Sequence, residues 1–222
     1  MSDSPSSKKW SDLRSALEAV PLFPLPEVVL YPGARLPLHV FEPRYRAMIR
    51  DVLDGTRKLA IVQLRPSAAA EEAQPPIATV AGVGEVVDAT ELPSGRFNIL
   101  VRGLARVSLE ELPFVPPYRR ARATILEAPA EAVPSGEIAA LISAATAFAS
   151  LVRERDKKFE LHLPRDTEAG TLADLCAAQL LIDGRDRQRA LETLEIGARV
   201  RLVTETIALQ RLAIAREQGP MN

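Results

Sequence analysis

Residues 20–55 decide the fold of the first part of the chain, and they read VPLFPLPEVVLYPGARLPLHVFEPRYRAMIRDVLDG. Prolines punctuate the beginning of this stretch, which excludes a long helix there and indicates short strands joined by turns. Pro43 then stands where the first residue of a helix is expected, and Gly55 suits its end. Between them apolar residues recur at helical spacing: Tyr45, Met48, Ile49, Val52 and Leu53. The spacing predicts a helix over residues 43–54.

Alternating apolar and polar residues beyond this helix predict a sheet. Phe97, Ile99 and Val101 share one face of a strand, and Ser94-Gly95 ahead of them predicts a hairpin turn from a strand over residues 80–88. After Gly103 the alternation resumes. Further strands are predicted over residues 36–40, 58–64, 106–110 and 118–126. The strands at 36–40 and 58–64 are the richest in apolar residues and are expected to be the more central ones, whereas residues 66–76 are predicted to form a loop.

Proline marks the main internal boundary, because sixteen of the eighteen prolines lie at or before Pro134. The remainder is free to be helical. An alanine-rich helix is predicted over residues 135–155, and three apolar stripes follow at helical spacing. The stripes are Leu172, Leu175, Cys176 and Leu180; then Arg187, Ala190, Leu191 and Leu194; then Ile196, Val200, Val203, Ile207 and Ile214. The predicted organisation is an N-terminal extension (1–19), a β-rich subdomain (20–127), a linker (128–136), a helical subdomain (137–215) and a tail (216–222).

Composition indicates an ordinary globular protein. Its charges are nearly balanced, so the chain as a whole does not have the excess positive charge that would attract polyanions. The 222 residues are 47% hydrophobic, 26% charged and carry a net charge of −1. One cysteine excludes an internal disulfide, and a structural zinc site is not expected from one cysteine and two histidines. The N-terminus has no apolar signal-peptide region, and the charge-free stretch at residues 138–152 is short for a membrane span. We therefore expect a cytoplasmic location and no membrane association.

The quoted segment resembles the N-terminal substrate-binding (LON) domain of the ATP-dependent protease Lon. GVGEVVDATELPSGRFNILVRGLARV (82–107) and LADLCAAQLLIDGRDRQRALETLEIGARVRLVTETI (172–207) resemble later parts of the same domain in the same order, so the resemblance covers about residues 20–215. It implies an α+β fold, with a PUA-like β pseudo-barrel of about six strands and one helix followed by a helical subdomain. One departure is Glu195 at the start of the last helix, because glutamate caps a helix poorly.

The resemblance implies a binding function without catalysis. Lon hydrolyses ATP and peptide bonds through modules that follow this domain, and these 222 residues contain no GxxxxGK[ST] phosphate-binding loop. We therefore expect a stand-alone module that is not an enzyme and needs no cofactor. Its expected partners are unfolded or extended polypeptide segments or a dedicated protein, held by an apolar groove where the β-rich and helical parts meet.

Two surfaces are candidates for binding. The first combines aromatic and basic residues where the resemblance is densest, and such residues often anchor binding patches. Its candidate peptide-binding residues are Tyr31, Arg35, His39, Phe41, Arg44 and Tyr45. The alternative is RNA binding by arginines on neighbouring strands, because PUA-like folds also occur in RNA-binding modules. That set is Arg102, Arg106, Arg119, Arg120 and Arg122, although acidic residues are interleaved with it and aromatic residues for base stacking are few.

The sequence gives weaker indications of catalytic, metal-binding or nucleotide-binding sites. His39 with Glu42 has the residue types of a base or half a metal site, but neither a further ligand nor a nucleophile motif accompanies them. Gly82 and Gly84 lack the third glycine of a dinucleotide fingerprint, so a bulge or a close chain approach is the better interpretation. Cys176 lies on an apolar stripe and is expected to be inert.

Overall fold

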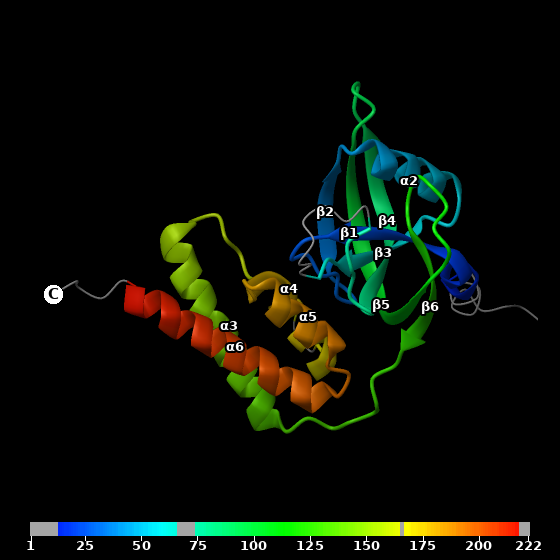
Figure 1. Cartoon of the computed structure of the whole chain (residues 1–222). Helices are drawn as coiled ribbons and strands as arrows, with labels where there is room; N and C mark the ends of the chain where they lie inside the picture. The colour runs from blue at the N-terminus through cyan, green and yellow to red at the C-terminus, as the bar shows by residue number, and fades with distance from the viewer. Residues whose placement is uncertain (1–12, 66–73, 165–166, 218–222) are drawn as a thin grey trace, which may run out of the picture. The chain divides into compact units, whose positions relative to one another are not determined.

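The longest strand, Phe97–Glu111, organises the sheet. It belongs to the first of two compact units. The computed structural model describes residues 13–65, 74–164 and 167–217, so most of the loop predicted at 66–76 lies outside the described residues. The chain divides into residues 1–126, here called the β unit, and residues 127–222, here called the helical unit. Figure 1 shows both units, and each is described by itself.

The β unit holds one curled sheet and one helix, which confirms the predicted α+β class. The strands are β1 (Val20–Leu25), β2 (Arg35–Val40), β3 (Lys58–Gln63), β4 (Val80–Glu91), β5 (Phe97–Glu111) and β6 (Arg120–Leu126). Their order in the sheet is β2-β5-β4-β3-β1-β6, and β5 also pairs with β6. Because β5 also pairs with β6, strands β5, β4, β3, β1 and β6 form a closed ring. Strand β2 pairs with β5 outside this ring, so the sheet is not a regular barrel.

Two strand predictions are corrected by this topology. The strand predicted at 36–40, now β2, lies at the end of the sheet order and not near its centre, whereas the one predicted at 58–64, now β3, is central and wholly buried as expected. The strand predicted at 106–110 is also not separate from the one before it, because Gly103 stays paired with Gly84 and β5 continues from Phe97 to Glu111. The hairpin turn at Ser94-Gly95 is confirmed: the Leu92 N–H donates to the Arg96 carbonyl at 2.8 Å.

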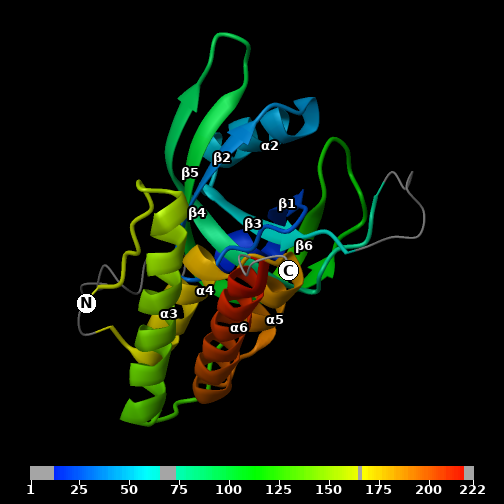
Figure 2. The same ribbon diagram turned by 90° about the vertical axis from the view of Figure 1, so that its left-hand side faces the viewer.

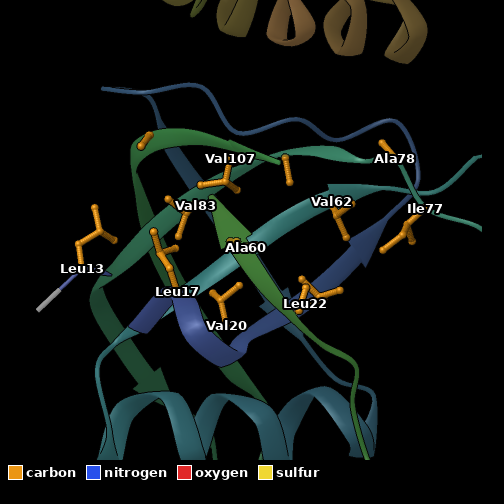
Figure 3. Close-up of a cluster of buried hydrophobic side chains, with 14 residues drawn as sticks. Leu13, Leu17, Val20, Leu22, Ala60, Val62, Ile77, Ala78, Val83 and Val107 are labelled. Carbon is orange, nitrogen blue, oxygen red and sulfur yellow. The ribbon is translucent and has the colours of Figure 1, made fainter. Parts of the chain in front are cut away.

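Helix α2 (Pro43–Asp54) has the bounds that the sequence predicts and covers one of two apolar cores. Met48 and Ile49 of α2 pack with Phe97 and Val101 of β5 in that core. The second core, drawn in Figure 3, is formed by β1, β3, β4, β5 and β6 together with Leu13 and Leu17. Leu17 belongs to a 3-10 helix, η1 (Leu17–Ala19), so the chain before β1 contributes to this core.

Glycines on β4 and β5 allow residues 30–34 to cross the sheet in direct contact with its backbone. A methyl group on Gly82 would overlap with the Leu30 carbonyl, and one on Gly103 with the Tyr31 carbonyl oxygen. The Gly103 N–H donates to the Ala34 carbonyl at 2.9 Å. The interpretation of Gly82 and Gly84 as sites of close approach is confirmed, and the register shifts beside Gly84.

The helical unit contains α3 (Ser135–Arg155), α4 (Ala169–Leu180), α5 (Gly184–Glu192) and α6 (Ile196–Glu217). The bounds of α3 are those predicted. The predicted apolar stripes supply much of the core, which includes Leu172, Cys176, Val200, Val203 and Ile207. By length and composition alone, helix α3 is long and apolar enough to cross a membrane. One such helix is weak evidence for a membrane span, and α3 packs along α6 and α4.

Candidate functional site

The outer face of β2 gathers part of the predicted peptide-binding set. Side chains alternate along a strand, so Arg35, His39 and Phe41 share the exposed face while Val40 is buried. The His39 Nδ1 atom lies 2.7 Å from Asn98 Oδ1 on β5, which fixes the imidazole ring. The ring of Phe41 lies 6.3 Å from that of His39 between centroids, at an interplanar angle of 24°. Phe41 is 60% exposed and is the apolar feature of this face.

Two other members of the set are core residues. Tyr31 is wholly buried, and Tyr45 packs its ring against Phe23 at 4.6 Å between centroids. Burial raises the pKa of the Tyr45 phenol above its ordinary value. Arg44 lies outside, with its guanidinium 4.5 Å from the centre of the Tyr45 ring and 2.9 Å from Glu42 Oε2. Tyr31 and Tyr45 therefore belong to the interior, and the exposed Arg44 lines a small pocket with Pro24 and Arg119.

The edge of β2 is unsuited to pairing with an added strand. In the described part of the chain β2 pairs with β5 alone, so its other edge has no strand beside it. Pro37 stands in the middle of β2 and has no N–H to offer. Proline on an edge strand is a common protection against pairing with another chain. A ligand on this face would therefore be held by side chains and not by a continuous main-chain ladder.

The arginines proposed for RNA binding are largely occupied by carboxylates. Arg102 pairs with Glu85, and both Nε and Nη2 of Arg119 donate to the Glu111 carboxylate at 2.8 and 2.7 Å. Arg106 is only 7% exposed. The other two members also have neighbours: Arg122 lies 3.5 Å from both Glu18 and Glu110, and Arg120 donates to the Tyr118 hydroxyl. The set does not present a row of free positive charges.

A groove in the helical unit is a second candidate surface, and the sequence did not single it out. Its volume is about 350 Å³, which is within the range of ligand pockets. Its lining comes from α3, the segment after it, the end of α4, the α4–α5 connection, α5 and α6: Phe148, Leu151, Val152, Arg155, Asp156, Phe159, Gln179, Leu180, Leu181, Ile182, Arg187 and Ile214. Ile182 is 58% exposed, so the lining is both apolar and open to solvent.

Two glutamines hold the walls of this helical groove. Gln179 on α4 binds the segment after α3 in both directions, because its Oε1 accepts from the His162 N–H at 2.9 Å and its Nε2 donates to the His162 carbonyl at 3.1 Å. Gln210 on α6 fixes the α4–α5 connection, accepting from the Ile182 N–H at 2.8 Å and donating to the Leu180 carbonyl at 3.0 Å. Both contacts join distant parts of the sequence, so periodicity could not reveal them.

The groups considered for catalysis are dispersed. His39 contacts Asn98, and His162 lies in the other unit, 3.5 Å from Glu160. Within the described ranges no group of three or more histidine, cysteine, aspartate or glutamate side chains is placed to hold a metal ion.

Cys176 is expected to resist alkylation while the protein is folded. Its side chain is wholly buried, and that burial raises the pKa of its thiol to about 12, so almost no thiolate forms near neutral pH. The thiolate is the reactive species. Iodoacetamide at pH 8, followed by mass spectrometry, should modify the native chain at least about a hundredfold more slowly than the urea-unfolded chain. Similar rates in both states would contradict this placement.

Comparisons with known proteins converge on one family. A family model described as the ATP-dependent protease La (LON) substrate-binding domain matches residues 19–208. The chain is 30% identical over 207 residues to a Lon protease of Roseiflexus castenholzii, covering 90% of this chain and 25% of the relative. It is also 30% identical over 221 residues to Lon protease 2 of Sorangium cellulosum, covering 92% of this chain and 26% of the relative. The chain thus spans about a quarter of the length of these relatives.

Solved structures agree on the fold. A Lon N-terminal domain protein from Xanthomonas campestris superposes with a TM-score of 0.59 at 20% identity, covering 88% of this chain and 97% of that one. The N-terminal domain of a Lon protease from the Mycobacterium avium complex gives a TM-score of 0.61 at 18% identity, with coverages of 86% and 98%. At these identities the likeness concerns the fold alone.

Proposed function

This chain belongs to the family of ATP-dependent protease La (LON) substrate-binding domains, and from that membership we propose that it binds extended segments of polypeptide without catalysing a reaction. The proposed occupant is an unfolded or flexible segment that presents apolar side chains, and the proposed location is the cytoplasm. Because a flexible segment is ordered on binding, the affinity should be modest.

The helical groove is the observation that carries this proposal. Apolar side chains from three helices surround a volume of about 350 Å³ that opens to solvent beside Ile182. An inserted leucine or phenylalanine would remove apolar surface on both sides from water, which favours binding by roughly 25 cal/mol per Å² buried. The two glutamine clamps keep the groove walls in place before a ligand arrives, so less ordering is required of the protein.

A fluorescence-anisotropy titration with a labelled, permanently unfolded protein tests the proposal. The wild-type chain should give saturable binding, and Ile182→Asp should weaken it at least about tenfold, because a carboxylate would stand in the apolar groove. Ile142→Asp is the matched control: Ile142 is also exposed and lies on α3, but it does not line the groove. This variant should bind within about twofold of wild type.

A Phe41→Asp variant measures the contribution of the β2 face in the same titration. Arg35, His39 and Phe41 are the members of the predicted set on this face, and we propose them, with the exposed Arg44, as a second contact for the bound segment. If Phe41→Asp abolishes binding and Ile182→Asp does not, the β2 face is the binding surface and the groove is not. Absence of saturable binding by wild type at high micromolar concentration would remove polypeptide recognition altogether.

RNA binding is not favoured by the arrangement of arginines, because carboxylates already neutralise most of the set. The two functions predict different responses to salt. Phosphate contacts weaken steeply as salt concentration rises, whereas apolar contacts do not. Repeating the titration between low and high salt with RNA and with unfolded protein therefore separates them.

A further inference from the structure

Two arginines of α2 meet at the tip of the β4–β5 hairpin, which extends past α2 at the top of Figure 2. Gly95 forms this tip with φ +70°. A methyl group on Gly95 would lie 2.8 Å from Arg46 Nη2 and 3.3 Å from Arg50 Nη2. The two guanidinium groups therefore lie together against Gly95, and a side chain at position 95 would crowd both of them.

The positive charge at this tip exceeds the negative charge beside it. Arg50 Nη2 donates to Glu91 Oε1 at 2.8 Å, and Arg96 Nε donates to Ser94 Oγ at 2.7 Å. In the described ranges no side-chain hydrogen bond or ion pair is found for the Arg46 guanidinium, and its Nε atom is buried without an acceptor. Of these three arginines, only Arg50 is paired with a carboxylate in the described part of the chain. An unsatisfied buried donor is uncommon in folded proteins and calls for a partner.

The positions of these groups are fixed by the surrounding structure. The Arg50 guanidinium lies 5.5 Å from the centre of the Phe97 ring, which supports it from one side. The hairpin is closed by hydrogen bonds of 2.8 Å from the Gly95 N–H to the Leu92 carbonyl and from the Leu92 N–H to the Arg96 carbonyl. The hairpin tip and the Arg50 guanidinium therefore have defined positions before any ligand is bound.

We propose that Arg46 and Arg50 form, beside Gly95, a binding site for an oxyanion: a carboxylate or a phosphate group. Guanidinium groups present paired N–H donors that match the oxygens of both anions, and a charge-assisted bond would satisfy the buried Nε of Arg46. The anion also offsets the repulsion between neighbouring cations. Two sources supply this chemistry, free phosphate and the carboxylate of a polypeptide, and the site does not depend on the function proposed for the helical groove.

Titration of the ¹⁵N-labelled chain with sodium phosphate at constant ionic strength tests the site by NMR. The Nε–H signals of Arg46 and Arg50 should shift saturably. Arg46→Met should weaken binding at least about tenfold, since one of two charged forks is removed. Arg185→Met, an exposed arginine on α5, changes the net charge equally and should bind phosphate like wild type. Should Arg46→Met fail to fold, Arg50→Met tests the same site from the other guanidinium.

The same titration with two further probes identifies the source of the anion. The probes are sodium acetate and one short peptide that ends in either a free carboxylate or an amide. Tighter binding of the carboxylate peptide than of its amide assigns the site to polypeptide carboxylates, whereas saturation by phosphate alone assigns it to phosphate. Shifts that rise linearly with every probe overturn the proposal. An equal loss of binding in Arg46→Met and Arg185→Met also overturns it, because only a general effect of charge would then remain.

Discussion

Replacement of Gly103 by alanine is expected to unfold the β unit at temperatures where the wild-type chain is stable. The added methyl group would overlap with the carbonyl oxygen of Tyr31. Neither backbone can yield easily, because Gly103 donates to the Ala34 carbonyl at 2.9 Å and accepts from the Gly33 N–H at 3.1 Å. We expect a loss of about 4 kcal/mol, a large part of the ordinary stability of a domain, and a melting temperature lower by on the order of 10 °C.

Gly136→Ala is the control for this variant. Gly136 lies in the first turn of α3, and an added methyl group there would have no neighbour within 4 Å. Alanine also favours helix more than glycine by up to about 1 kcal/mol, so this variant should be as stable as wild type or slightly more so. Hydrogen exchange followed by mass spectrometry locates the effect: β4 and β5 should lose protection in Gly103→Ala. A melting temperature within about 2 °C of wild type would contradict the close approach.

Local signals in the sequence were sufficient wherever one element's own residues determine its structure. The helices at 43–54 and 135–155 and the turn at Ser94-Gly95 follow from periodicity, proline and glycine placement, and the structure confirms all three. The same reasoning failed for β2. Its apolar residues do face inward, but apolar content reports burial of one face and not a strand's place in the sheet order.

Short strands were expected at the start of the first segment, but no strand with the bounds of β1 was predicted, and its two prolines are unusual in a strand with neighbours on both sides. The structure shows how they are accommodated. Pro21 lies where β1 pairs with β6, and Pro24 lies where it pairs with β3. The two pairings occupy successive parts of the strand, so each proline needs a hydrogen-bonding partner on one side at most. This division depends on strands far along the chain, and the segment alone does not contain it.

The start of α6 shows the same limit for the helical unit. Glu195 was expected to leave this helix poorly capped, but the carboxylate of Glu131 accepts from the Gly197 N–H at 3.0 Å. A residue 66 positions earlier therefore satisfies one of the free N–H groups at the helix terminus. The helical groove also depends on long-range contacts, since Gln179 and Gln210 hold its walls across long sequence separations. Residue types identified plausible surface groups such as Phe41, and helical spacing already placed Tyr45 on an apolar stripe, but only packing showed that Tyr31 is inside.

The largest effect in the helical unit is expected from breaking the buried ion pair between Asp174 of α4 and Arg199 of α6. Their side chains are 4% and 3% exposed, and Arg199 Nε lies 3.1 Å from Asp174 Oδ1. Asp174→Leu leaves a buried guanidinium without its carboxylate, and such a loss costs about 3–5 kcal/mol. Urea unfolding followed by circular dichroism at 222 nm should show it. Glu137→Gln breaks the more exposed pair with Arg201 and should cost less than about 1 kcal/mol.

A double variant separates the charge of Arg199 from its hydrogen bonds. Arg199 Nη1 also donates to the carbonyls of Thr193 and Leu194, at 2.6 and 3.1 Å, and so closes the α5–α6 connection. In Asp174→Leu with Arg199→Met no unpaired charge remains, so part of the stability should return. Recovery should be incomplete by about 1–3 kcal/mol, because the two carbonyls lose their donor. A double variant as stable as wild type would show that Arg199 acts on Asp174 alone, and one no better than Asp174→Leu would show that the unpaired charge is not the source of the loss.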